Sequence, residues 1–148
     1  MSLNTAGKAG VQRPRTTAGQ HLSLIVGVLL VLLGLGGFLV TGFGDVTGGT
    51  HEQQVIGFAV NPLANVLHLV LGALGLLART GARRARGYGL LLVAAGIALF
   101  AYSATADVNV LNANWPTSTV HLLLAFAGAV IAFVPVRAST LPSTAELD

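Results

Sequence analysis

The sequence has little charge and no cysteine, and each shortage excludes whole classes of protein. Charged residues make up 9% of the 148 residues, whereas apolar residues make up 53% and the mean hydropathy is +0.77. A soluble domain carries about 25% charged residues, so this chain cannot cover a water-facing surface. The lack of cysteine excludes disulfides, thiolate metal sites and cysteine nucleophiles. The composition therefore predicts an integral membrane protein of one domain.

Groups that support catalysis or metal binding are also scarce. Methionine occurs only as Met1, so a soft copper site lacks ligands. The serines lack a base and an orienting acid at a spacing typical of nucleophilic catalysis. We therefore expect no enzyme, and no metal site other than the haem alternative given below.

Four stretches are long and apolar enough to cross a bilayer, which takes about 20 residues. They cover about residues 22–43, 62–79, 88–106 and 117–136. The predicted fold is all-α, an integral membrane four-helix bundle within residues 21–137. Residues 1–20 and 138–148 are expected to be flexible cytoplasmic tails.

Every lysine and arginine lies on one side of this arrangement. Three precede the first span, four lie between the second and third, and one follows the fourth. They are Lys8, Arg13, Arg15, Arg79, Arg83, Arg84, Arg86 and Arg137. Cytoplasmic loops are rich in basic residues, so both termini are expected inside a bacterial plasma membrane. We assign these charges to orientation and lipid headgroups rather than to nucleic acid.

The first and third spans resemble each other. Aligning Gly27–Val46 with Gly89–Val108, 62 residues later, gives eight identities in twenty positions. Five of the matches, together with Thr41 aligned on Ser103, recur every three or four residues and form one stripe along each helix. In the first span they are Gly27, Val31, Gly34, Phe38 and Asp45. The second and fourth spans match at an offset of 53 residues, with a histidine at equivalent places.

The repeat predicts two parallel copies of a helix hairpin, related by a pseudo-twofold axis along the membrane normal. Small residues on the matched stripes let helix backbones approach closely. The residues expected at these contacts are Gly27, Gly34, Gly72, Gly75, Gly89, Gly96, Ala125 and Gly128.

Polar residues gather at the outer ends of the predicted spans. Asn61 followed by Pro62 is a strong helix start, and His68 and His121 lie about 10 Å further along their helices. Intramembrane histidine is rare and faces the bundle interior. The candidate polar cluster comprises Asp45, Asn61, Asn65, His68, Asp107, Asn114, Ser118 and His121. The apolar run Val55–Val60 is expected to lie along the membrane face or to cap this cluster as a lid.

The stretch from Val55 to Gly72 resembles an uncharacterised bacterial family of four-span membrane proteins, domain of unknown function 4383. Its hallmark, Asn-x(3)-Asn-x(2)-His-Leu at the start of span two, matches Asn61, Asn65, His68 and Leu69. A second Asn-x-x-His-Leu usually opens span four, where this chain has Ser118 in place of the asparagine. The resemblance implies a fold and no known activity.

Three roles for the histidines stay open. They form interhelical hydrogen bonds with the neighbouring asparagines, or they ligate a b-type haem as an axial pair. In the third, they form an outer-face site for a quinone or lipid headgroup, another small ligand or a proton. The first role makes the chain a scaffold or accessory subunit in the bilayer, associated with other membrane subunits or with itself as a homodimer.

Overall fold

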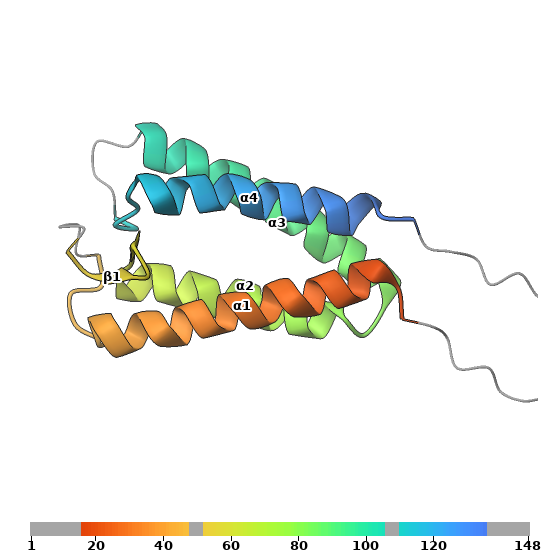
Figure 1. Ribbon diagram of the computed structural model, residues 1–148, viewed down its shortest axis with the longest axis horizontal. Coiled ribbons are helices and arrows are strands. Elements are labelled where there is room, and N and C mark those ends of the chain that lie inside the picture. The colour runs from red at the N-terminus through yellow and green to blue at the C-terminus, as the bar shows by residue number, and fades with distance from the viewer. Residues whose placement is uncertain (1–15, 48–51, 106–109, 136–148) are drawn as a thin grey trace, which may run out of the picture.

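The computed structural model describes residues 16–47, 52–105 and 110–135, and within them the fold is almost entirely helical. The four helices are α1 (Ala18–Thr41), α2 (Pro62–Ala78), α3 (Ala82–Thr105) and α4 (Trp115–Phe133). An antiparallel hairpin of β1 (Gln54–Val55) and β2 (Phe58–Ala59) precedes α2. The helices run side by side, each reversing the direction of the one before (Figure 1).

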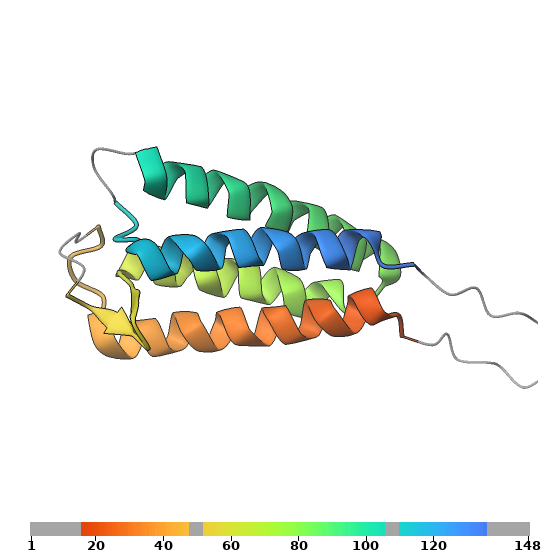
Figure 2. The same ribbon diagram turned by 45° about the horizontal axis from the view of Figure 1, so that its top comes forward.

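The bundle has two distinct ends, which Figure 2 shows from a second side. The β1–β2 hairpin and the start of α4 lie at one end, called here the hairpin end. The start of α1, the α2–α3 connection and the end of α4 lie at the other, called the arginine end because Arg79–Arg86 lies there. The two described ends of the chain therefore leave the bundle on the same side.

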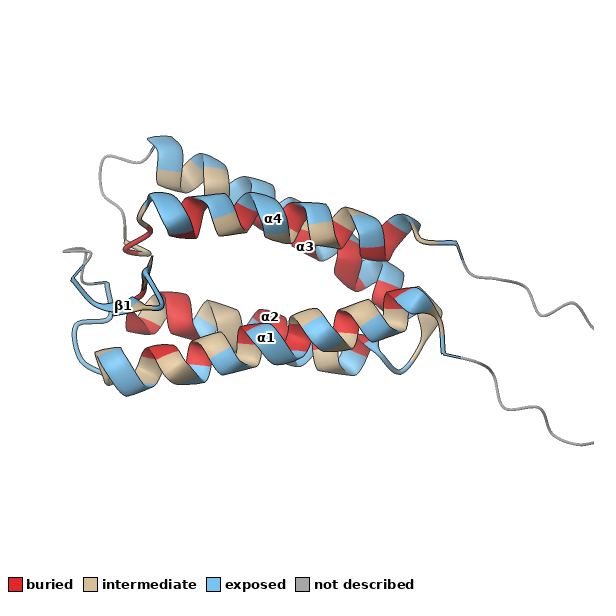
Figure 3. Ribbon diagram, in the orientation of Figure 1, coloured by how far each residue is buried: buried red, intermediate tan, exposed pale blue. Residues whose placement is uncertain are grey.

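Three of the four helices have the length and hydropathy to cross a membrane. They are α1, α3 and α4, whereas α2 is apolar but has 17 residues. Their outer faces expose large apolar side chains, such as Leu39 at 90% and Phe126 at 70%. Such a surface is unfavourable in water and matches the interior of a bilayer. Figure 3 shows exposed positions along the outside of every helix.

The helix α1 does not coincide at either end with the first span expected from the sequence, residues 22–43. α1 begins at Ala18, inside the stretch assigned to the N-terminal tail, because Thr17 and Gln20 form a capping box that satisfies free N–H groups. It ends at Thr41 because Gly42 adopts a φ of 61° and donates its N–H to the Phe38 carbonyl. Residues 1–15 and the predicted C-terminal tail 138–148 lie outside the described residues.

The arginine connection is much shorter than expected. Only residues 79–81 separate α2 from α3, which begins at Ala82 rather than 88 and contains three of the four arginines. Thr80 and Gly81 donate their backbone N–H groups to the Leu77 and Ala78 carbonyls, so the chain reverses in one turn. α4 begins at Trp115, two residues early, because Asn114 caps it, and it ends at Phe133 instead of 136.

Glycines let α1 pack directly on the backbone of α2. A Cβ added at Gly27 would lie 2.9 Å from the Gly72 carbonyl oxygen, and one added at Gly34 would lie 2.8 Å from the Asn65 carbonyl oxygen. These distances leave no room for any side chain. Gly75 faces the Cα of Gly27 from the other side, so the two backbones touch along the pair.

The α3–α4 pair is built in the same way. A Cβ at Gly89 would lie 2.6 Å from the Gly128 carbonyl oxygen, and one at Gly96 would lie 2.5 Å from the His121 carbonyl oxygen. All eight small residues expected at the contacts are buried. The contacts between the two pairs are sparser than those within each pair.

Apolar side chains join the two pairs toward the arginine end. Ala78, Ala85, Tyr88 and Ile131 are buried there, in one cluster that continues toward the middle of the bundle. The remaining buried members of the cluster are Leu30, Leu71 and Leu92. At the hairpin end the pairs are joined differently, through polar groups.

Candidate functional site

Two asparagines begin the helices that carry the histidines. The Asn61 Oδ1 accepts a hydrogen bond from the Ala64 N–H at 2.8 Å, and the Asn114 Oδ1 accepts one from the Thr117 N–H at 3.0 Å. Both residues have extended backbone and a proline close behind them, so each acts as a helix N-cap. A cap uses only the amide oxygen, which leaves both side-chain N–H groups free to bond elsewhere.

Those N–H groups link the two connections at the hairpin end. The Asn61 Nδ2 donates to the Val110 carbonyl at 2.7 Å, and the Asn114 Nδ2 donates to the Gly57 carbonyl at 3.0 Å. The Asn112 Nδ2 donates to the Val60 carbonyl at 3.0 Å. We call Asn61, Asn112, Asn114 and Thr117 the inter-loop clasp.

Thr117 completes the clasp on the β2 strand. Its hydroxyl lies 2.7 Å from the Asn114 Oδ1 and 3.3 Å from the Ala59 carbonyl oxygen, so its one hydrogen can be donated to either acceptor. The Ala59 N–H donates to the Asn114 Oδ1 at 3.3 Å. Ala59 is fully buried, whereas Ile56 at the hairpin tip is 91% exposed. The Val55–Val60 run was expected to form a lid or to lie along the membrane face. It instead forms part of a β-hairpin that is hydrogen-bonded to the start of α4.

Asn65 connects the helices of the first pair. Its Nδ2 donates to the Thr41 hydroxyl at 3.0 Å, and its side chain fills the space beside Gly37. The Asn65 Oδ1 is buried without a hydrogen-bond partner among the described residues. Ser118, the equivalent position in α4, donates instead to the Asn114 carbonyl of its own helix at 3.0 Å.

His68 and His121 lie on one small cavity between α2 and α4. The cavity has a volume of about 20 Å³, and apolar side chains and Thr117 form the rest of its wall. The Nδ1 atoms of both rings are buried and have no hydrogen-bond partner in the described part of the chain. A volume of roughly 10–15 Å³ admits one water, so the cavity has room for a single molecule of that size.

The two aspartates do not join this cavity in the described structure. Asp45 is exposed in the connection after α1, at a φ of 41°, and is not part of the cavity wall. Asp107 lies outside the described residues. Residues 16–47, 52–105 and 110–135 bring together no group of three or more metal-binding side chains.

The haem hypothesis requires space that this arrangement does not provide. A porphyrin between the two histidines would occupy the cavity that has room for roughly one water. Neither a porphyrin nor a quinone ring fits there with the helices packed as described. The small residues of α2 and α4 face the helix contacts instead, where glycines admit neighbouring backbones.

Sequence reasoning missed Asn112 and Thr117. Asn112 is 2% exposed and has a φ of 55°, a left-handed conformation that asparagine tolerates better than most residues. Two asparagines separated by one residue just before a helix were the available signal. Their partners are backbone carbonyls in another connection, which no local pattern specifies.

The fold and the site together define a helical membrane protein whose two helix pairs are fastened at one end by asparagine side chains. The model of the family described as domain of unknown function (DUF4383) matches residues 20–134. The chain therefore belongs to that family. This match confirms the family resemblance that the sequence around Asn61 and His68 indicated. No curated protein and no solved structure matches the chain.

Proposed function

We propose that the protein is a four-span scaffold or accessory subunit of the bacterial plasma membrane, without catalytic activity of its own. The observation that carries this proposal is that the side-chain N–H groups of the asparagines at the hairpin end are bonded to other parts of the chain. Both caps, the clasp and the Asn65–Thr41 bond all join one part of the fold to another. Polar groups bonded in this way stabilise the fold, and few of them remain available to bind a ligand or to catalyse a reaction.

The proposed topology places the arginine end in the cytoplasm. Arg79, Arg83, Arg84 and Arg86 lie together there, whereas the described carboxylates, Asp45 and Glu52, lie at the hairpin end. This is the distribution that the positive-inside rule predicts. With α2 as the fourth span, its 17 residues reach about 26 Å at 1.5 Å per residue, near the lower limit for crossing the hydrocarbon core.

Because the chain has no cysteine, single introduced cysteines test this topology directly. Gln53→Cys and Thr80→Cys place one exposed thiol at each end of the bundle. In intact cells whose outer layers are permeabilised, a membrane-impermeant thiol reagent should label the first variant and label the second only after lysis. Labelling of Thr80→Cys before lysis would overturn the orientation.

Duplication of a helix hairpin is also part of the proposal. Asn61 and Asn114 are 53 residues apart, and so are the two carbonyls that their side chains reach, those of Gly57 and Val110. This reciprocity supports a pseudo-twofold axis between the pairs. The glycine contacts depart from this symmetry. Gly34 packs on the Asn65 backbone, but Gly96, its equivalent in α3, packs on the backbone of His121. His121 lies three residues, or about one helical turn, beyond Ser118, which is the equivalent of Asn65.

The scaffold role can be tested by asking whether another protein or only lipid covers the exposed apolar faces of the helices. A photoreactive side chain is placed at Leu32 or Leu39 of α1, and separately at Leu123 or Phe126 of α4, all of which are exposed. After irradiation of native membranes, one face should give a cross-linked protein of constant mass while the other gives lipid adducts. Lipid adducts from every position would show that the protein works alone and would overturn the proposal.

A proton or water site is the second candidate function, and the two buried Nδ1 atoms favour it. Both histidines line a cavity of about 20 Å³, and their Nδ1 atoms lack partners among the described residues. A water with polar neighbours is a common occupant of such space. Nitrogen NMR of ring-labelled histidine should then show one water-exchanged site that shifts in the Thr117→Val variant. Two independent rings would exclude a shared site.

A further inference from the structure

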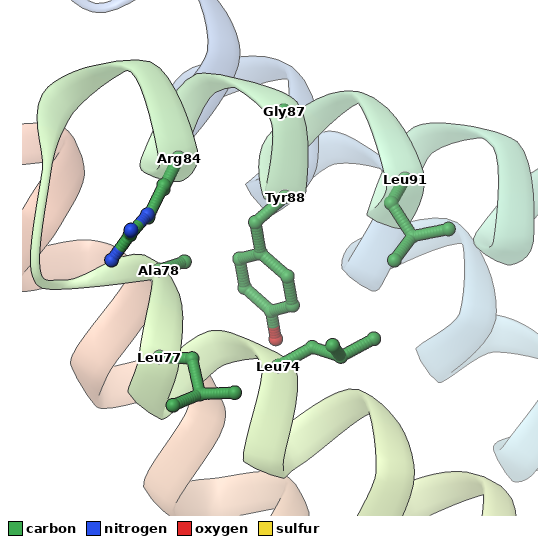
Figure 4. Close-up of a pocket in the computed structure, with 7 residues that line it drawn as sticks. All are labelled: Leu74, Leu77, Ala78, Arg84, Gly87, Tyr88 and Leu91. Atoms are coloured by element: carbon green, nitrogen blue, oxygen red, sulfur yellow. The ribbon is translucent and has the colours of Figure 1, made fainter.

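A groove opens on the membrane-facing surface at the arginine end, far from the histidines. It lies between the end of α2 and the beginning of α3 and has a volume of about 280 Å³. Leu74 and Leu77 of α2 face Leu91 of α3 across it, and Arg84 stands at its outer edge (Figure 4). The groove is therefore apolar along most of its length and cationic at one end.

The positive charge at this edge has no carboxylate to balance it in the described structure. The Arg84 guanidinium donates to the Thr80 hydroxyl at 2.7 Å, and the described acidic residues lie at the opposite end of the bundle. Arg83 is exposed on the same turn, while Arg86 donates to the Ala132 carbonyl at 2.9 Å. An anion can therefore approach Arg84 without displacing an ion pair.

Tyr88 forms part of the wall of the same groove. Its side chain is 4% exposed, and its hydroxyl is buried without a hydrogen-bond partner among the described residues. The ring runs from α3 toward α2 and places the hydroxyl beside Leu74, over Gly75, where an added Cβ would lie 2.7 Å from it. The hydroxyl itself has almost no accessible surface, so it is the side of the Tyr88 ring that a ligand in the groove would contact.

We propose that this groove binds one anionic phospholipid, with its phosphate on Arg84 and an acyl chain along the leucines and the Tyr88 ring. Basic pockets between membrane helices on the cytoplasmic side are known to suit such headgroups. The inference rests on the proposed insertion and orientation, which place this end of the bundle in the cytoplasmic leaflet. A phosphate and a hydrocarbon chain on one molecule match the two ends of the groove.

Gly87 offers a way to fill the groove without disturbing the fold. It lines the groove, and a Cβ added there meets nothing within 4 Å, which is equally true of Gly81 in the connection outside the groove. Gly87→Leu should therefore block the acyl position, and Gly81→Leu is the matched control. Arg84→Gln removes the phosphate contact, with Arg83→Gln as the control for general loss of charge.

The experiment is native mass spectrometry of the full-length protein in detergent, titrated with phosphatidylglycerol or with phosphatidylcholine of the same chain length. The wild type should retain one phosphatidylglycerol in preference to phosphatidylcholine. Arg84→Gln and Gly87→Leu should each weaken that retention by about fivefold or more. Tyr88→Phe, which keeps the ring in the groove wall, and both control variants should stay within about twofold of the wild type.

Three results would overturn the inference. Equal retention of the two lipids would show that the phosphate charge is not recognised. Equal effects of Arg83→Gln and Arg84→Gln would indicate a diffuse charge effect. A change of subunit number in Gly87→Leu without lipid loss would assign the groove to a protein helix. Failure of the wild type to fractionate with membranes would instead contradict the proposed function itself.

Discussion

Asn61 and Asn114 make reciprocal hydrogen bonds across the hairpin end of the bundle. Each caps its own helix with its amide oxygen and donates its amide N–H to a carbonyl in the connection before the other helix, at 2.7 Å and 3.0 Å. One side chain type thus performs a local and a long-range function at once. The two functions can be separated, because an aspartate keeps the oxygen and loses the donor.

Asn114→Asp should therefore destabilise the link between the helix pairs while preserving the start of α4. The Gly57 carbonyl is exposed and can bond to water once this donor is lost, so the free energy of unfolding should fall by the net value of one hydrogen bond, about 0.5–1.5 kcal/mol. Thermal unfolding in detergent measures the change. Gln53→Glu, the same amide-to-acid change at an exposed position, is the control. Equal stabilities of the two variants would contradict the clasp.

Gly96→Ala should be strongly destabilising because the space beside it is filled by backbone. The added Cβ would lie 2.5 Å from the His121 carbonyl oxygen and 2.8 Å from the Ala125 nitrogen, so α3 and α4 must separate. Overpacking of this kind costs about 1–3 kcal/mol. Unfolding in detergent should show a lower midpoint and a loosened α3–α4 contact in disulfide-trapping experiments between introduced cysteines.

Gly87→Ala is the matched control for that substitution, since it lies in the same helix with nothing within 4 Å of the added Cβ. The alanine should raise stability slightly, by about 0.5–1 kcal/mol, through its higher helix propensity. If both variants lose stability alike, helix propensity or insertion, rather than packing against His121, would explain the effect.

A double substitution of the histidines tests whether they stabilise the bundle or have another function. Replacing His68 and His121 together by Phe removes two buried nitrogens that have no partner in the described residues. Removal of unsatisfied polar groups is nearly neutral or stabilising when shape is kept, so unfolding should shift by less than about 1 kcal/mol. A much larger loss would mean that the rings hold the bundle through bonds of their own.

The residues whose roles follow from local rules were the ones accessible from the sequence. Asn61 before Pro62 predicts a helix cap, and the repeated glycine spacing predicts backbone contacts at Gly27 and Gly96. These rules depend on neighbours within one or two helical turns. The all-helical class and the membrane setting follow from composition in the same way.

The remaining features depend on residues far apart in the chain. The Asn112 side chain bonds to Val60, and the register of Gly96 on His121 differs by about one turn from that of Gly34 on Asn65. Both involve contacts between segments far apart in the chain, so no local pattern specifies them. The arginine connection was misjudged for another reason, since four arginines suggested a loop although α3 begins at Ala82 and contains three of them.

The β1–β2 turn leads to a final prediction, because a strained residue stands where its side chain makes little contact. Ile56 has a φ of 53° and is 91% exposed, and it is followed by Gly57 at a φ of 84°. Two-residue hairpin turns with two positive φ angles favour Asn-Gly. A left-handed conformation costs a β-branched residue roughly 1–2 kcal/mol, and the Ile56→Asn variant should recover much of this.

Amide hydrogen exchange of Val60, whose N–H bonds to the Gln53 carbonyl at 2.9 Å, reports on the hairpin directly. In Ile56→Asn the exchange should slow by about fivefold, the factor expected for roughly 1 kcal/mol. The Ile56→Val variant keeps the β-branched strain and should exchange at the wild-type rate. Equal exchange in the two variants would mean that the tip is unstrained. The exposed isoleucine would then cost the fold nothing.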